Sequence, residues 1–285
     1  MKTKLFLIIL SIAIIPFTTC TKNSTNPDQA TINLVDDDAV SGVVSDDVFN
    51  SVDYASIILE NVLGQGTPKS LTVPVDSCPS VTIDNLVLGV WPKTITIDYG
   101  AECTGFNGST RSGKIIITFT DRRSVVGSVR TVTFENYFFN NIKLEGTWVL
   151  TNLGPNASQH VVISVELTGG KLTLTGGKTV ERSFEHQREW IAGWDTPNIW
   201  DDEILITGVG TGKTIDDVAY ATTITTPLHW KRVCEFLVSG VIEIERAGLT
   251  PVELDYGQGD CDAIATLTIG NKTLEITLRH IYRLQ

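Results

Sequence analysis

The chain has 285 residues, and 33 aspartates and glutamates against 22 lysines and arginines give it a net charge of −11 at pH 7. A surface this acidic argues against binding to nucleic acid and against electrostatic docking on anionic lipid. The length is sufficient for one large β domain or two small ones.

Residues 1–19 have the pattern of an export signal. Lys2 and Lys4 form a short positive region, and the apolar run that follows over residues 5–15 is too short to cross a bilayer as a helix. The run stops at Cys20, where a bacterial lipoprotein signal would be cleaved and the cysteine lipidated. We therefore expect an outer-membrane protein anchored through lipid on Cys20, on a membrane face that the sequence leaves open. Ordinary cleavage with an idle Cys20 is the alternative.

Two segments follow the signal. Residues 20–45 are polar and acidic, which predicts a flexible tether between the lipid and the fold. Residues 46–64 carry apolar side chains at helical spacing, which predicts one short helix that Gly64 would end. These apolar positions are Val48, Val52, Ala55, Leu59 and Val62.

Residues 71–285 read as one all-β domain. Short alternating runs rich in threonine are separated by glycine turns, at 169–170, 176–177 and 270–271 among others. This rhythm predicts an antiparallel sandwich, barrel or meander, and no alternation of strand and helix appears.

The domain contains an internal duplication. "CPSVTIDNLVLGVWPKTITIDYGAEC" and "CEFLVSGVIEIERAGLTPVELDYGQGDC" share the order cysteine, strand, turn, strand, Asp-Tyr-Gly, cysteine. We place them in repeat units 71–121 and 227–281, with intervening strands over 122–226. In each unit the two cysteines lie symmetrically about a turn, as in a β-hairpin. The pattern predicts disulfides Cys78–Cys103 and Cys234–Cys261, each contributing roughly 3–4 kcal/mol to stability.

The repeated Asp-Tyr-Gly is best explained by structure. Tyr99 and Tyr256 end alternating runs that would face the core, and Asp98 and Asp255 would serve the turns. Calcium binding is the alternative, since Asp255 is followed by two more aspartates, Asp260 and Asp262, but the spacing fits no standard calcium loop.

The chain resembles a family of predicted envelope lipoproteins of unknown function from Bacteroidetes-type bacteria. The resemblance rests on "WPKTITIDYGAECTGFNGSTRSGKIIIT", "NIKLEGTWVLTNLG", "REWIAGWDTPNIWDDEILITGVGTG" and "LDYGQGDCD". It implies an envelope lipoprotein with an all-β body and says nothing about a substrate.

Motifs for nucleotide, metal and acyl chemistry are absent from the sequence. "GVGTGKT" has Thr207 where a phosphate-binding loop needs its first glycine, so we interpret it as a glycine-rich turn between strands. The four histidines lie far apart, and no serine-hydrolase turn is present. We therefore expect no nucleotide, no cofactor and no resident metal.

The stretch "FEHQREWIAGWDTPNIWDDE" combines aromatic and acidic side chains. The candidate ligand-binding residues are Trp190, Trp194, Trp200, Asp201 and Asp202. Our first interpretation is a loop whose tryptophans cap the β core, because large aromatic side chains are mostly buried. Glycan binding through an aromatic platform comes second, and glycosidase chemistry by paired carboxylates third.

The sequence thus predicts a lipid-anchored, all-β envelope protein with a structural or binding role rather than an enzyme. A glycan-binding surface module, a periplasmic carrier of an apolar ligand and a carbohydrate-active enzyme are the alternatives. An exposed tryptophan platform would favour the first of these, and a hollow fold would favour the second.

Overall fold

The computed structural model describes residues 29–64, 78–105, 108–196, 199–234 and 236–278. It contains one long helix, a single antiparallel sheet of 14 strands and a short 3-10 turn, η1 (Ile199–Asp201). Strand follows strand as a meander in the order β1-β2-β4-β5-β6-β7-β8-β9-β10-β11-β12-β13-β14, and β3 pairs with β4 beside this path. The expected all-β class with antiparallel strands is therefore confirmed, as an open sheet. The predicted signal peptide and Cys20 lie outside the described residues.

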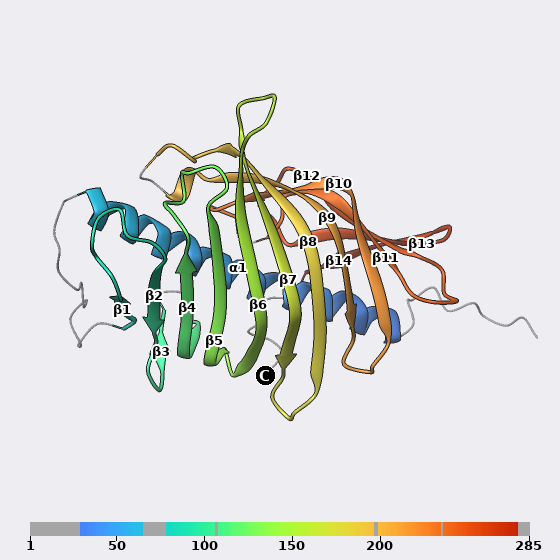
Figure 1. Ribbon diagram of the computed structural model, residues 1–285. Coiled ribbons are helices and arrows are strands. Elements are labelled where there is room, and N and C mark those ends of the chain that lie inside the picture. The colour runs from blue at the N-terminus through green and yellow to red at the C-terminus, as the bar shows by residue number, and fades with distance from the viewer. Residues whose placement is uncertain (1–28, 65–77, 106–107, 197–198, 235, 279–285) are drawn as a thin grey trace, which may run out of the picture.

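The strands in the middle of the sheet are the longest. The elements are α1 (Gln29–Gly64), β1 (Ser80–Ile83), β2 (Lys93–Asp98), β3 (Cys103–Thr104), β4 (Thr110–Phe119), β5 (Val129–Phe139), β6 (Ile142–Pro155), β7 (Val161–Thr173), β8 (Thr179–Ala192), β9 (Glu203–Lys213), β10 (Ala219–Lys231), β11 (Ser239–Glu245), β12 (Val252–Gln258), β13 (Ile264–Ile269) and β14 (Lys272–Thr277). Figure 1 shows the long strands side by side, with α1 crossing behind them.

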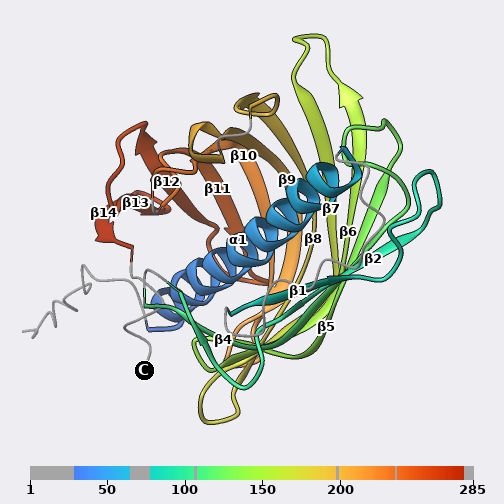
Figure 2. The ribbon, with the colours of Figure 1, turned by 90° about the vertical axis from the view of Figure 1, so that its left-hand side faces the viewer.

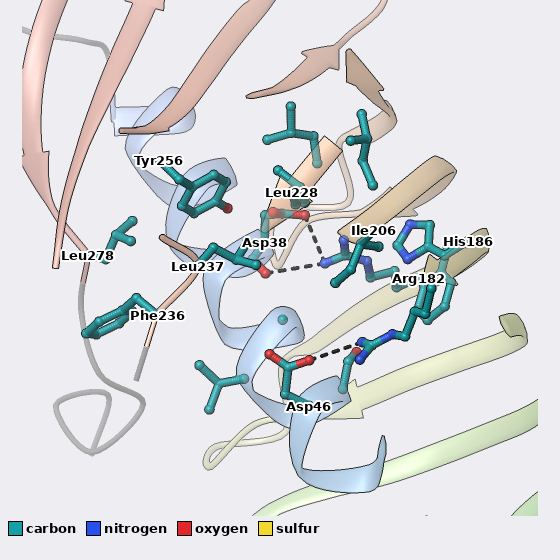
Figure 3. Close-up of a pocket in the computed structure, with 17 residues that line it drawn as sticks. Asp38, Asp46, Arg182, His186, Ile206, Leu228, Phe236, Leu237, Tyr256 and Leu278 are labelled. Carbon is teal, nitrogen blue, oxygen red and sulfur yellow. Dashed lines mark hydrogen bonds and ion pairs between the residues drawn. The ribbon is translucent and has the colours of Figure 1, made fainter. Parts of the chain in front are cut away.

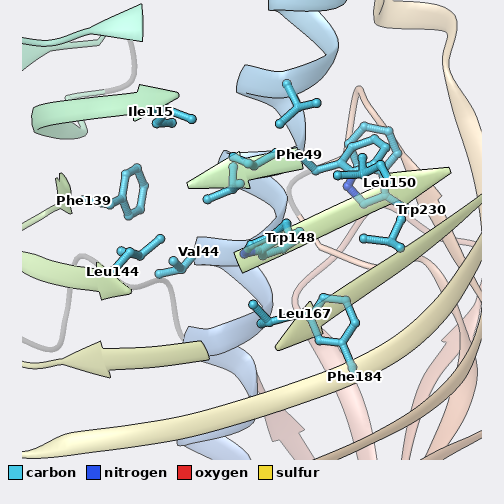
Figure 4. Packing of buried hydrophobic residues seen from close by; sticks show 14 of the residues in the cluster. Val44, Phe49, Ile115, Phe139, Leu144, Trp148, Leu150, Leu167, Phe184 and Trp230 are labelled. Carbon is cyan, nitrogen blue, oxygen red and sulfur yellow. The ribbon is translucent and has the colours of Figure 1, made fainter. Parts of the chain in front are cut away.

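The sheet curves around the helix. Figure 2 shows α1 running through the concave side, with β1 and β2 to one side and β12, β13 and β14 to the other. The concave face carries the apolar side chains of each alternating strand, and α1 packs into them. In Figure 4, Val44 and Phe49 of the helix point toward Trp148, Leu150 and the other labelled core side chains of the sheet. The core thus lies between one helix and one curved sheet.

The helix is longer than the sequence predicted. It begins at Gln29, so residues 29–45 are helical and the predicted tether is wrong over that range. Acidic residues of this segment suggested a solvated tether, but two of them are buried: Asp37 and Asp38 are 6% and 4% exposed. Two serines of the helix can also be buried, because the hydroxyls of Ser41 and Ser56 donate to backbone carbonyls one turn earlier in the helix.

Carboxylates of the helix pair with arginines of the sheet and its loops. The pairs are Asp38–Arg182 (2.9 Å), Asp46–Arg188 (3.1 Å), Asp47–Arg111, Asp53–Arg123 (2.8 Å), Asp53–Arg232 (3.2 Å) and Glu60–Arg122 (3.2 Å). A buried carboxylate is tolerated only when it is paired and hydrogen-bonded. These six contacts explain how an acidic helix can lie inside the fold, and they fix its position along the sheet.

The two repeat units lie toward opposite ends of the sheet. Both predicted disulfides are present, Cys78–Cys103 and Cys234–Cys261, with Cα–Cα distances of 5.7 and 5.2 Å. The second joins the ends of the β11–β12 hairpin as expected. In the first, the chain bends after β2, and Cys103 lies in β3, which pairs with β4. β1 and β2 do pair as an antiparallel hairpin, but Ser80 lies opposite Asp98, so only the register differs from the one that the cysteine spacing predicted, and the cysteine pairing is right.

The repeated triplet plays the same structural part in both units. The carboxylates of Asp98 and Asp255 accept the backbone N–H of Gly100 and Gly257, at 2.8 and 2.9 Å. Both glycines have positive φ, which their lack of a side chain permits. Tyr99 and Tyr256, each 8% exposed, belong to the core around the helix. The structural interpretation of this phrase is confirmed.

Two glycine segments differ from expectation. The pair at 169–170 lies inside β7, where the register with β8 shifts, whereas turns form at 176–177 and 270–271 as predicted. "GVGTGK" is not a turn but the second half of β9. A Cβ at Gly208 or Gly212 would come within 2.1 or 2.5 Å of a carbonyl oxygen of β8. Glycine is needed there for close strand approach.

The shared carboxylate Asp53 gives a direct test of the helix–sheet contacts. Its side chain is 4% exposed and pairs with both Arg123 and Arg232. We expect Asp53→Ala to lower the free energy of unfolding by about 3–5 kcal/mol, because it removes the buried carboxylate that Arg123 and Arg232 share. Urea denaturation measures the loss.

Glu60→Ala is the matched control. Its partner Arg122 is 41% exposed, so the loss should be about 0–1 kcal/mol. Equal small losses for the two variants would contradict the view that buried pairs hold the helix in place.

Candidate binding pocket

Strand β8 presents cationic and apolar side chains alternately to the helix. Successive residues of a strand point to opposite faces, so Arg182, Phe184, His186, Arg188 and Trp190 share one face. All five lie on the side of α1: Arg182 and Arg188 pair with its carboxylates, and Phe49 of the helix lies 5.6 Å from Trp190 between ring centroids. β8 therefore combines arginine, histidine and aromatic groups within the concave face.

A pocket opens between this strand and the helix. It has a cavity volume of about 100 Å³ and is partly open to solvent. Part of its apolar wall comes from β9, β10 and the segment between β10 and β11. This wall includes Ile206, Ile224, Leu228, Phe236 and Leu237. In Figure 3, Asp38 and Arg182 meet in the middle of the pocket, with Tyr256 and Leu237 on one side and Ile206 and His186 on the other.

The helix contributes small residues where it borders the pocket. Gly42, Val43 and Ser45 line it, and a Cβ added at Gly42 would meet no atom within 4 Å. Glycine inside a helix is destabilising by roughly 0.5–1 kcal/mol relative to alanine. At Gly42 the absent side chain leaves room in the pocket.

Burial and nearby charges both shift the pKa values of ionisable groups in the pocket wall. Burial raises the pKa of Asp46, although Arg188 and Arg182 oppose the shift. Burial, followed by the nearby charges of Arg182 and Arg188, lowers the pKa of His186 to about 3. His186 is therefore neutral at physiological pH, and its ring stacks on Phe184 at 4.2 Å between centroids.

The two arginines of the pocket have N–H donors that make no hydrogen bond within the protein. Arg188 pairs with Asp46 through Nη2, and Arg182 with Asp38 through Nη1. Nε and Nη1 of Arg188 and Nε of Arg182 are buried and have no hydrogen-bond partner in the protein. Unmet buried N–H groups are expensive, and a water or a ligand with an acceptor atom would satisfy them.

The predicted tryptophan platform does not form as one exposed surface. Trp190 is 3% exposed, Trp194 is partly buried and Trp200 is 62% exposed. Trp194 packs edge-on against Trp190 at 5.2 Å, and the Arg123 guanidinium lies 4.5 Å above its ring. Two of the three tryptophans therefore belong to the packing around the helix, as the first interpretation expected. Glycan binding stays a prediction, and of the three tryptophans only Trp200 has an exposed ring that could contact a sugar.

The two predicted acidic residues also separate. Asp201 is exposed and accepts a hydrogen bond from the Thr196 hydroxyl at 2.8 Å. Asp202 is 5% exposed and pairs with Arg232 at 3.4 Å, in the same cluster as Asp53. Asp202 thus helps to position the helix and does not face a ligand-binding surface beside Trp200.

Within the described ranges, no group of three or more histidine, cysteine or acidic side chains could hold a metal ion. In the same residues, no helix is long and apolar enough to cross a membrane. The chain matches no protein-family model, no curated protein and no solved structure. Arguments about function therefore rest on the geometry of this molecule.

Sequence reasoning missed the pocket residues. "RSFEHQREW" does contain a signal for them, because two arginines and the histidine alternate along the strand with Phe184 and Trp190 and so point to the same face. The alternation indicates that charged side chains lie on the face that points to the core. Nothing local showed that acidic residues about 140 positions earlier would supply the counter-charges, a separation that the Arg188–Asp46 pair makes explicit.

The carboxyl of Asp202 predicts a pH dependence of stability. Burial, with a contribution from Asp53, raises its pKa to about 6. A raised carboxyl pKa favours the folded protein at low pH, and this contribution is lost as pH rises through about 6. We expect wild type to lose more stability than Asp202→Asn between pH 4.5 and pH 7.5.

Thermal melts of both proteins across this range measure the difference. Asp201→Asn, a matched change at the exposed neighbour, gives the background. Parallel pH profiles for wild type and Asp202→Asn would show that Asp202 does not titrate abnormally.

Proposed function

We propose that this protein is a lipid-anchored envelope protein that holds an apolar small molecule in the pocket between α1 and strands β8 to β11. The observation that carries the proposal is the pocket itself. Small-molecule sites are concave, mostly apolar and supplied with a few polar groups that fix orientation. This pocket has apolar side chains in its wall, two arginines paired with two aspartates, one neutral histidine and an opening to solvent.

The anchoring half of the proposal is supported by the N-terminal sequence. Two lysines, an apolar run and Cys20 form a lipoprotein-type signal, and the other four cysteines pair with one another. Cys20 is thus left over from the disulfides, as a lipid-bearing cysteine should be. An envelope location of this kind, in the outer membrane, also suits disulfide formation. A carrier held there would bind apolar molecules that pass between membrane and aqueous phase.

Filling the pocket from the helix tests the binding half. Gly42→Leu places a side chain into the space that Gly42 leaves open, and both Gly42→Leu and Gly42→Ala should stabilise the helix by roughly 0.5–1 kcal/mol. We expect Gly42→Leu to weaken binding of the uncharged fluorescent probe N-phenyl-1-naphthylamine by about tenfold or more, or about 1.4 kcal/mol. Gly42→Ala should bind nearly as wild type does.

Fluorescence titration of the three proteins gives the affinities, and thermal melts verify that the variants fold. The binding proposal fails if wild type does not bind the probe, or if Gly42→Leu binds it unchanged.

Removing the lipid attachment tests the anchoring half. Cys20→Ser should leave the protein unacylated and in the soluble fraction after cell lysis, because lipid supplies its strong membrane affinity. Membrane fractionation with a carbonate wash, and mass spectrometry of the mature N-terminus, measure both properties. A variant that still sediments with membranes after the wash would refute lipid anchoring.

A further inference from the structure

Arg182 and Arg188 form the polar part of the pocket, where they pair with Asp38 and Asp46. The arginine side chains are 10% and 5% exposed, which is rare for arginine, and both line the pocket. They lie six residues apart on one face of β8, with Phe184 and His186 between them. Because His186 is neutral, the arginines provide the positive charge in this part of the pocket.

The helix carboxylates do not use all the donors of these arginines. As described above, three buried guanidinium nitrogens lack an acceptor in the protein: Nε and Nη1 of Arg188 and Nε of Arg182. A guanidinium presents five N–H donors in a planar fork, which suits the paired oxygens of a carboxylate or phosphate. The unused donors therefore match an anionic group better than a hydroxyl or a carbonyl.

The two carboxylates differ in how firmly they are enclosed. The side chain of Asp38 alone is 6% exposed and stays against Arg182, whereas the side chain of Asp46 is 32% exposed at the pocket. An incoming anion can therefore share Arg188 with Asp46 more easily than it can displace Asp38 from Arg182. This places the anion-binding part of the pocket at Arg188, with the unused Nε of Arg182 as a further donor.

The remaining wall offers only apolar contacts to the rest of a ligand. Ile206, Ile224, Leu228 and Leu237 present hydrocarbon next to the arginines. A neutral apolar molecule would leave the guanidinium donors unmet, and a cationic head group has no acceptor atom to offer them. An anion with an apolar body satisfies both parts of the wall.

We propose that the ligand is an amphipathic anion, with a single carboxylate or phosphate head group bound at Arg188 and Arg182 and a hydrocarbon body against the apolar wall. This inference rests on the proposed binding function and specifies the chemistry of its ligand. The shared chemistry is an oxyanion on an aliphatic chain.

Displacement of N-phenyl-1-naphthylamine tests the head group. Four competitors with the same 12-carbon chain are compared below their micelle concentrations: dodecanoate, dodecyl phosphate, 1-dodecanol and dodecyltrimethylammonium. We expect at least one of the two anions to bind wild type about tenfold or more tightly than 1-dodecanol, because it alone meets the guanidinium donors. The cation should bind more weakly than the alcohol, and the tighter anion identifies the head group.

A charge-neutral double variant locates the effect. Arg188→Gln with Asp46→Asn removes the arginine without leaving its carboxylate unpaired, and it should reduce the preference for anion over alcohol to about threefold or less. Arg111→Gln with Asp47→Asn makes the same change at a helix–sheet pair outside the pocket and should keep the preference. If the first double variant fails to fold, the comparison of the four competitors on wild type still tests whether the site prefers an anionic head group.

The outcomes separate the two proposals. If the probe binds and 1-dodecanol competes as well as both anions, the anionic head group is wrong while the apolar site stands. Retention of the anion preference in the folded Arg188 double variant would also overturn the assignment. If the probe does not bind wild type, the proposed function itself fails.

Discussion

Pairing between the carboxylates of α1 and the arginines of the concave face is the constraint on which the fold depends. A helix with this many acidic residues would ordinarily lie on the surface. Here five of its carboxylates meet arginines from β4, β8 and the segments after β4 and β10. Burying a charge without a partner costs more free energy than hydrophobic packing supplies, so each buried pair fixes the helix at one point of the sheet.

The same arrangement produces the pocket. Side chains of the helix fill the concave face where they are large, as Phe49 does against Trp190, and leave it open beside Gly42. Arg182 and Arg188 are needed to pair with Asp38 and Asp46, yet each guanidinium has more donors than one carboxylate uses. Structural pairing thus leaves partly satisfied guanidinium groups beside apolar side chains, and the proposed binding function rests on this combination.

Local pattern made the sheet predictable. Alternation in runs such as those ending at Tyr99 and Tyr256, together with the duplicated cysteines, gave the class, the core faces and both disulfides. The first half of α1 was not predictable in this way, because the arginines that neutralise Asp38 and Asp46 lie far away in sequence. For the same reason, "FEHQREWIAGW" drew attention to its tryptophans, whereas the pocket uses its arginines and histidine. The glycines of β9 were misread because close strand approach is a property of neighbouring strands.

Hydrogen exchange of the backbone amides in α1 tests most directly whether the acidic helix is buried against the concave face of the sheet. Amides in a buried, paired helix open only with the rest of the fold, so those between Leu34 and Leu59 should exchange as slowly as the central strands β6 to β9. The segment from Leu34 to Ser45 is decisive, since it is the part that looks like a solvated tether in the sequence. Slow exchange there supports the account, and exchange at the rate of an unprotected chain would contradict it.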